Sequence, residues 1–160
     1  MALFTHEFEA PLTMHGIGKS RVIWYQVLFM PERLARELPL REHPRLRVRG
    51  EIVDIPVAGA WIPSGDGRHY FIVSPTVRKA TGARLRDMLD MRFVVDDQDR
   101  VDVPAALEAA LRANPGLHAV WLELSPGRRR GLAHRVAQAK SSDTVRRRIR
   151  YVLDALSDYL

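Results

Sequence analysis

The chain has 160 residues, of which 46% are hydrophobic and 28% are charged, and its formal net charge is +6. This composition is typical of a globular protein with one domain or two small ones. The absence of cysteine excludes disulfides, thiolate metal sites and a cysteine nucleophile. No stretch has the pattern of a secretory leader or stays apolar for the ~18 residues of a membrane span, so we expect a cytoplasmic protein.

The first hundred residues have the hydrophobic pattern of strands. Their apolar positions alternate or form short runs that Gly and Pro interrupt. We expect a short helix over Pro31 to Leu38, because proline suits the first turn, and a hairpin turn over Ser64 to Gly67. The predicted strands are Leu3–Ala10, Arg21–Phe29, Leu46–Ile55, Val57–Ile62, His69–Ser74 and Met88–Val95.

A second short helix is predicted over Pro75 to Gly82, where Gly82 can supply the left-handed residue that ends it. The resulting order of strand, short helix and strand resembles the swapped-hairpin barrels of AbrB-type transition-state regulators, which bind DNA as dimers. Four arginines would then lie near one end of the barrel, namely Arg78, Arg84, Arg86 and Arg92. Several acids in the same stretch repel phosphate, which argues against DNA binding by the barrel.

From Pro104 onward the hydrophobic period is helical. Asn114-Pro115-Gly116 and Ser125-Pro126-Gly127 interrupt the pattern. The predicted helices are Pro104–Ala113, Leu117–Leu124, Arg128–Lys140 and Asp143–Tyr159. The change of period predicts two domains, a small β-barrel domain of unknown function over residues 1–102 and a helical domain over residues 103–160.

An arginine block over residues 128–150 carries the positive charge of the chain. It holds nine bases and one acid, a net charge of +8, whereas the other residues hold 16 bases and 18 acids, a net charge of −2. In the last predicted helix the arginines lie off an apolar stripe of Val145, Ile149, Val152, Leu153, Leu156 and Leu160. One interpretation is a solvated face, steadied by i, i+4 ion pairs of Asp143 with Arg147 and of Arg150 with Asp154. The other is a surface for an anionic partner.

The sequence gives little indication of metal binding or catalysis. The six histidines show no zinc-site spacing, and no serine, histidine and acid pattern indicates a nucleophile. We therefore predict no metal, no cofactor and no catalytic residue, which favours a non-catalytic protein and leaves the question of an enzyme open. Trp24, Trp61 and Trp121 are interpreted as core or pocket-wall residues, with stacking platforms for bases as the alternative. The core is favoured for Trp121, and for Trp61 it is favoured over a pocket wall.

The C-terminal residues resemble a known family. Ala139-Lys140, Thr144 and Arg147-Arg148-Ile149, followed by an apolar tail, are similar to the C-terminal signature of the bacteriocin-protection, YdeI or OmpD-associated family. Val103-Pro104 at the start of a helix is similar to the family's beginning. The family has Arg where this chain has Val145. The resemblance implies candidate anion-binding residues at Lys140, Thr144, Arg147 and Arg148, to which the charge pattern adds Arg128, Arg129, Arg130, Arg146 and Arg150.

The first hundred residues resemble the small β domain that often precedes this family in bacterial proteins. The resemblance is carried by Trp24–Pro31, by Val48–Ile55 with Gly50, by Gly65–His69 and by Arg78–Gly82. Where the related domains have a Gly-Asp turn before the last strand, this chain has Arg86-Asp87. The resemblance implies an α+β fold, in which an N-terminal double-split, AbrB-like β-barrel is followed by a C-terminal region of about four helices.

The resemblance implies a bacterial protein linked to antimicrobial or stress tolerance, and the charge pattern favours a binding protein. The partner would be an anionic small molecule or an acidic protein, because the arginine fork suits carboxylate and phosphate oxygens. The alternative is a nucleic-acid-binding regulator that uses the same basic helices, which we do not favour. An oligomer is compatible with the sequence.

Overall fold

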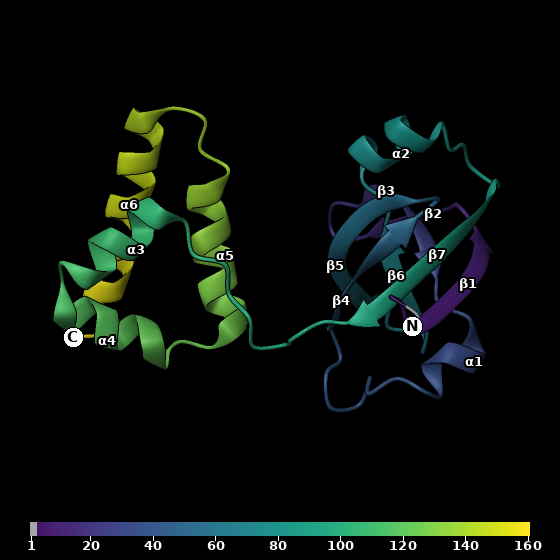
Figure 1. Ribbon diagram of the computed structural model, residues 1–160, viewed down its shortest axis with the longest axis horizontal. Coiled ribbons are helices and arrows are strands. Elements are labelled where there is room, and N and C mark those ends of the chain that lie inside the picture. Colours follow the sequence, from purple (N-terminus) through teal and green to yellow (C-terminus); the bar gives the residue numbers. More distant parts are fainter. Residues whose placement is uncertain (1–2) are drawn as a thin grey trace. The chain divides into compact units, whose positions relative to one another are not determined.

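The computed structural model describes residues 3–160 (Figure 1). The first two residues of the predicted N-terminal domain lie outside the described residues. The chain divides into two compact units, Met1–Gln98 and Asp99–Leu160. All the strands lie in the first unit and four of the helices lie in the second, so the fold class is α+β.

The N-terminal unit is a curled half-barrel sheet of seven antiparallel strands, in the order β1-β7-β4-β5-β6-β3-β2. The strands are β1 (His6–Pro11), β2 (Thr13–Ile17), β3 (Ile23–Phe29), β4 (Leu46–Ile52), β5 (Ile55–Pro63), β6 (His69–Ile72) and β7 (Met88–Val95). The two edge strands are separated in the sequence by the buried Leu12 alone, so the sheet must curl. The short helices α1 (Glu32–Ala35) and α2 (Pro75–Thr81) lie at opposite ends of the curled sheet (Figure 1).

An aromatic cluster fills the centre of this unit. The indole of Trp61 is fully buried, and its ring centre lies 5.7 Å from Phe8, 5.7 Å from Phe71 and 5.8 Å from Phe93. The core interpretation of Trp61 is therefore confirmed. The same interpretation is wrong for Trp24, whose side chain is 63% exposed.

The strands differ from the sequence prediction in one additional strand and in several of their bounds. Strand β2 was not expected, because its five residues mix polar and apolar types without a clear alternation. The predicted strand over Leu46–Ile55 ends instead at Ile52, where Val53 and Asp54 have φ angles of 47° and 65° and form the turn to β5. Such a turn joins antiparallel strands well, but a β-branched residue at its first position gives no warning in the sequence.

The predicted hairpin turn at Ser64 to Gly67 is confirmed. Asp66 accepts hydrogen bonds from the Ser64 hydroxyl, from the Arg68 backbone N–H at 3.0 Å and from the Arg68 guanidinium. These donors hold the pKa of Asp66 well below its usual range, and the bonds to Arg68 contribute most. Helix α2 also ends as expected, because Gly82 adopts a left-handed φ of 70°.

The Arg86-Asp87 turn before β7 keeps a left-handed residue although it lacks a glycine. Arg86 has a φ of 77°, its backbone N–H donates to the Leu12 carbonyl at 2.8 Å, and the Asp87 carboxylate accepts from the Arg84 backbone N–H. A side chain is strained in this conformation, whereas glycine is not.

We therefore expect Arg86→Gly to raise the free energy of unfolding by about 1 kcal/mol, since the relief of strain exceeds the added freedom of the unfolded chain. Chemical denaturation would measure it. The matched control is Arg84→Gly, two residues earlier and outside the left-handed region, which should not stabilise the protein. A loss of stability in Arg86→Gly equal to that of the control would contradict the assignment of strain.

The C-terminal unit consists of four helices, which agrees with the predicted number. They are α3 (Ala105–Arg112), α4 (Pro115–Glu123), α5 (Pro126–Ala137) and α6 (Ser142–Ser157). The core of the unit is made by apolar residues that recur at helical spacing: Leu107, Leu111, Trp121, Ala133, Val136, Val152 and Leu156. Trp121 is only 2% exposed, so its core interpretation is confirmed.

Candidate anion-binding face

Helix α6 positions the C-terminal part of the arginine block. The Ser141 hydroxyl accepts a hydrogen bond from the Thr144 backbone N–H at 3.2 Å, which caps the helix, and Asp143 lies in its first turn, where the helix dipole favours an acid. Val152 and Leu156 are fully buried and fix the rotation of the helix about its axis. The polar residues of α6 are therefore held in fixed directions around the helix.

Four residues of α6 form one stripe on its surface. Thr144, Arg147, Arg148 and Tyr151 are spaced three and four residues apart, which places them on the same side of a helix. The guanidinium of Arg147 donates to the Thr144 hydroxyl at 3.3 Å. Three of the four predicted site residues thus share a face, and the spacing that joins them to Tyr151 was already visible in the sequence.

Helix α5 contributes a further arginine to this stripe. Arg148 donates from Nη1 to the backbone carbonyl of Arg135 at 2.7 Å, and the guanidinium carbon of Arg135 lies 4.3 Å from the centre of the Tyr151 ring. A cation over an aromatic face is attracted to it. We call the set of Arg135, Thr144, Arg147, Arg148 and Tyr151 the arginine face. Sequence reasoning did not select Arg135, because its contact with Tyr151 depends on the packing of α5 against α6, and it did not select Tyr151 although the helical spacing places it beside Arg147 and Arg148.

Among the described residues, the arginines of this face lack the ion pair that their neighbour Arg146 makes. Within the part of the chain that the structure describes, Arg135, Arg147 and Arg148 have no carboxylate at ion-pair distance. Asp143 pairs with Arg146 and not with Arg147. The expected pair of Asp143 with Arg147 is therefore wrong, because the acid at the start of the helix binds the arginine three residues on. The expected pair of Arg150 with Asp154 is also wrong, since no ion pair joins these two described residues.

The structure does not bring the other predicted residues into the arginine face. Arg128, Arg129 and Arg130 lie at the start of α5, where Arg129 donates to the Leu124 carbonyl and Arg130 to the Arg100 carbonyl. Six residues of helix span about 9 Å, so Arg129 is roughly that far along the axis from Arg135. Arg146 and Arg150 lie on another flank of α6. Lys140 is exposed in the turn between α5 and α6, next to the capping Ser141.

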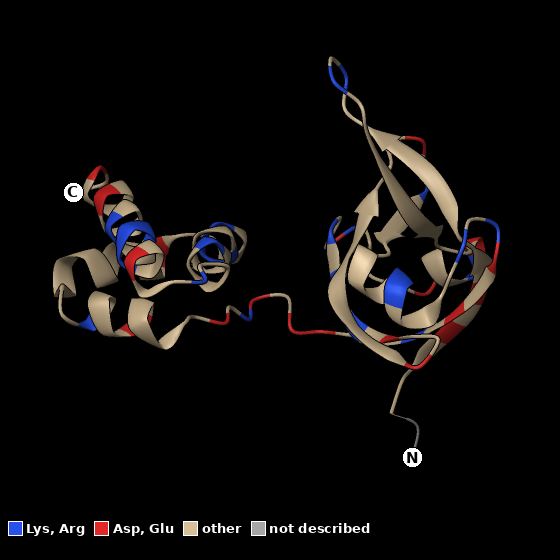
Figure 2. Cartoon of the chain, turned by 90° about the horizontal axis from the view of Figure 1, so that it is seen from above, with Lys and Arg blue, Asp and Glu red and all other residues tan. Residues whose placement is uncertain are grey.

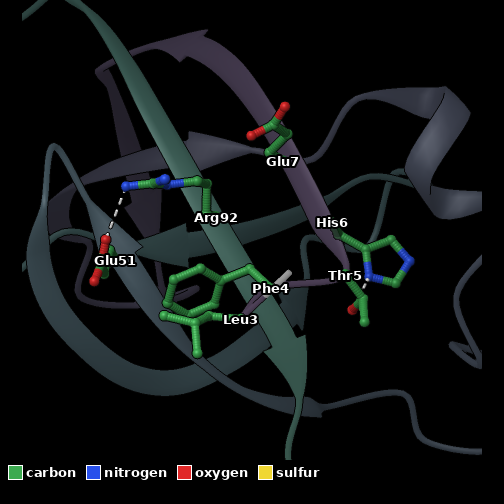
Figure 3. A pocket seen from close by; sticks show the side chains of 7 residues that line it. All are labelled: Leu3, Phe4, Thr5, His6, Glu7, Glu51 and Arg92. Carbon is green, nitrogen blue, oxygen red and sulfur yellow. Dashed lines mark hydrogen bonds and ion pairs between the residues drawn. The ribbon is translucent and has the colours of Figure 1, made fainter. Parts of the chain in front are cut away.

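The N-terminal unit has a surface hollow in which Arg92 is paired with Glu51 (Figure 3). Its volume is about 510 Å³, and it is lined by Leu3, Phe4, Thr5, His6, Glu7, Glu51 and Arg92. The Arg92 guanidinium lies 3.0 Å from the Glu51 carboxylate and 2.8 Å from the Asp54 carboxylate. Two carboxylates thereby neutralise Arg92.

No group of three or more histidines or acids that could hold a metal occurs within residues 3–160. Over the same range, every helix is too short or too polar to cross a bilayer.

The C-terminal unit is a four-helix domain, and its polar surface includes the arginine face.

This class of domain is also recognised from its sequence. Residues 100–158 match the profile of the family described as Bacteriocin-protection, YdeI or OmpD-Associated, and this stretch is a domain of that family. The match confirms the family resemblance of the C-terminal residues, and its range includes Lys140, Thr144, Arg147 and Arg148. No curated protein matches the chain.

Proposed function

We propose that this protein is a non-catalytic binding protein linked to antimicrobial or stress tolerance. Its C-terminal domain would bind an anionic small molecule or an acidic protein through the arginine face. The observation that carries the proposal is that, among the described residues, Arg135, Arg147 and Arg148 are held in place without an ion pair. In the described chain these arginines are ordered by a carbonyl, a hydroxyl and an aromatic ring, and no carboxylate neutralises them.

This arrangement suits an anionic ligand for an energetic reason. Each contact with a neutral group fixes a guanidinium but leaves most of its N–H donors available. An arginine that is already held loses less conformational freedom when it binds, so more of the interaction energy appears as affinity. Guanidinium groups on one helix side match the oxygens of a carboxylate or phosphate in pairs. The partner would therefore present several anionic oxygens close together.

A nucleic acid is the alternative partner. The first turn of α5 provides Arg128, Arg129 and Arg130, which together with the arginine face would cover more than one phosphate. Asp143, Asp154 and Asp158 on α6 oppose a long anionic strand, so a compact anion fits better. The double-split, AbrB-like class of the N-terminal barrel remains a prediction, and the proposal does not depend on it.

The test compares two double variants that remove the same charge from the same helix. Arg147→Ala with Arg148→Ala changes the arginine face, and Arg146→Ala with Arg150→Ala changes the other flank. The probes are inorganic phosphate, citrate and a ten-residue polyglutamate peptide, each titrated by NMR at two salt concentrations. We expect citrate, a compact anion with several carboxylates, to bind, and the first variant to weaken binding by about tenfold or more, as expected for lost charge-assisted hydrogen bonds.

The matched variant should weaken binding by less than about threefold, because it changes only the overall charge. Both variants should unfold at nearly the wild-type temperature, since all four side chains lie off the buried stripe. Binding of none of the three probes, or equal weakening by both variants, would overturn the proposal. Tighter binding of a 15-base-pair duplex, with an affinity that falls steeply with salt, would establish the nucleic-acid alternative instead.

A further inference from the structure

The hairpin of β2 and β3 projects from the N-terminal unit, with basic residues at its tip (Figure 2). The strands pair from Thr13 with Val27 to Ile17 with Ile23. Gly18 begins the connecting loop with a φ of 122°, and a Cβ at this position would lie 2.1 Å from the Arg21 carbonyl oxygen. Only glycine fits there without strain, so the close turn and the projecting tip are specified by the sequence.

The tip exposes large apolar side chains on both of its faces. Trp24 is 63% exposed, Ile23 52% and Val22 47%. Val22 and Trp24 lie on the face of Gly16, because a Cβ added to Gly16 would be 2.8 Å from Val22 Cγ1 and 3.1 Å from the Trp24 ring. Ile23 pairs with Ile17 and points to the opposite face. The apolar surface therefore surrounds the tip instead of forming one flat patch.

All the formally charged side chains of the hairpin and its flanks are basic. Leu12 to Pro31 contains neither Asp nor Glu, while Lys19 and Arg21 are exposed at the turn. Within the described residues, neither of these two cations has a carboxylate at ion-pair distance. A partner of this tip must therefore offer an apolar region for these side chains and negative charge directly beside that region.

We propose that the β2–β3 hairpin docks on an anionic lipid membrane surface. Trp24, Ile23 and Val22 enter the boundary between headgroups and acyl chains, where an indole is favoured, and Lys19 and Arg21 contact anionic headgroups. A fluid lipid layer covers both faces of a projecting tip, whereas a flat protein partner covers one. Val22 and Ile23 offer no ring for base stacking, which separates this tip from a nucleic-acid platform.

The test uses the full chain and vesicles of phosphatidylcholine, with or without one third phosphatidylglycerol. We expect cosedimentation with the anionic vesicles and weak binding to the neutral ones. Trp24→Ala should weaken binding about tenfold, the effect expected when one large apolar side chain no longer leaves water. Brominated acyl chains should quench the wild-type fluorescence but not that of Trp24→Ala, because Trp61 and Trp121 are buried.

Lys19→Glu with Arg21→Glu should also abolish most binding. The controls are Met88→Ala, which removes a 60% exposed apolar residue from the same unit, and Lys79→Glu with Arg84→Glu, which makes an equal charge reversal there. Both controls should bind as the wild type does. The proposal is wrong if anionic vesicles do not bind, or if the hairpin variants behave like their controls. It is also wrong if only Arg147→Ala with Arg148→Ala reduces binding, because the arginine face would then hold the lipid.

Discussion

Trp61→Ala should cost the N-terminal unit about 3–5 kcal/mol, the range found when a large aromatic is removed from a core. The indole is fully buried and touches three phenylalanines on different strands, Phe8 of β1, Phe71 of β6 and Phe93 of β7. Alanine would leave a cavity where these strands meet. Because whole domains are stable by only about 5–15 kcal/mol, a large part of the stability of this unit would be lost.

Trp61→Phe is the informative control for this prediction. The Nε1 atom of Trp61 is buried and has no hydrogen-bond partner among the described residues. Phenylalanine keeps most of the ring volume and removes this unpaired donor, so it should cost less than half as much as alanine. Hydrogen exchange measured by mass spectrometry should be faster in Trp61→Ala than in the wild type within residues 3–98. It should change little in residues 99–160. Equal losses for the two variants would show that ring packing is not the source of the stability.

The helices were more predictable from the sequence than the sheet, for a local reason. Each helix of the C-terminal unit is defined by nearby residues, such as the caps Ser125 and Ser141 and the prolines in the first turns of α4 and α5. A strand is defined by a neighbour far along the chain. Trp24 illustrates the difference: its run of apolar residues predicts a buried strand, but β3 extends beyond β6 into a hairpin that no other strand covers.

The candidate site was predictable to a similar extent. The spacing of Thr144, Arg147 and Arg148 identifies one side of a helix, and that assignment required no tertiary structure. Arg135 reaches the same side only because α5 packs against α6, and the carbonyl that binds Arg148 belongs to the backbone. Ion pairing was the least predictable feature, because Asp143 can reach an arginine three or four residues on, and the difference depends on side-chain rotamers.

Gly50→Ala should destabilise the N-terminal unit by about 3 kcal/mol, at the upper end of the usual cost of overpacking. Gly50 pairs with Phe93 across β4 and β7, and an added Cβ would lie 1.9 Å from the Arg92 carbonyl oxygen and 2.7 Å from the Phe93 Cα atom. Both obstacles are backbone atoms, so no side-chain rotation can relieve the contact. The two strands would have to separate, which would weaken the ladder and displace Arg92 from Glu51.

The matched control is Gly59→Ala on the neighbouring strand β5. A Cβ at Gly59 would meet only the ring of Phe71, at 3.1 Å, and a side chain can shift by a few tenths of an ångström. We therefore expect Gly59→Ala to cost about 1 kcal/mol, the lower end of the same range. Urea denaturation followed by circular dichroism would compare the two variants. Equal stability of Gly50→Ala and Gly59→Ala would show that the backbones of β4 and β7 do not approach each other so closely at Gly50.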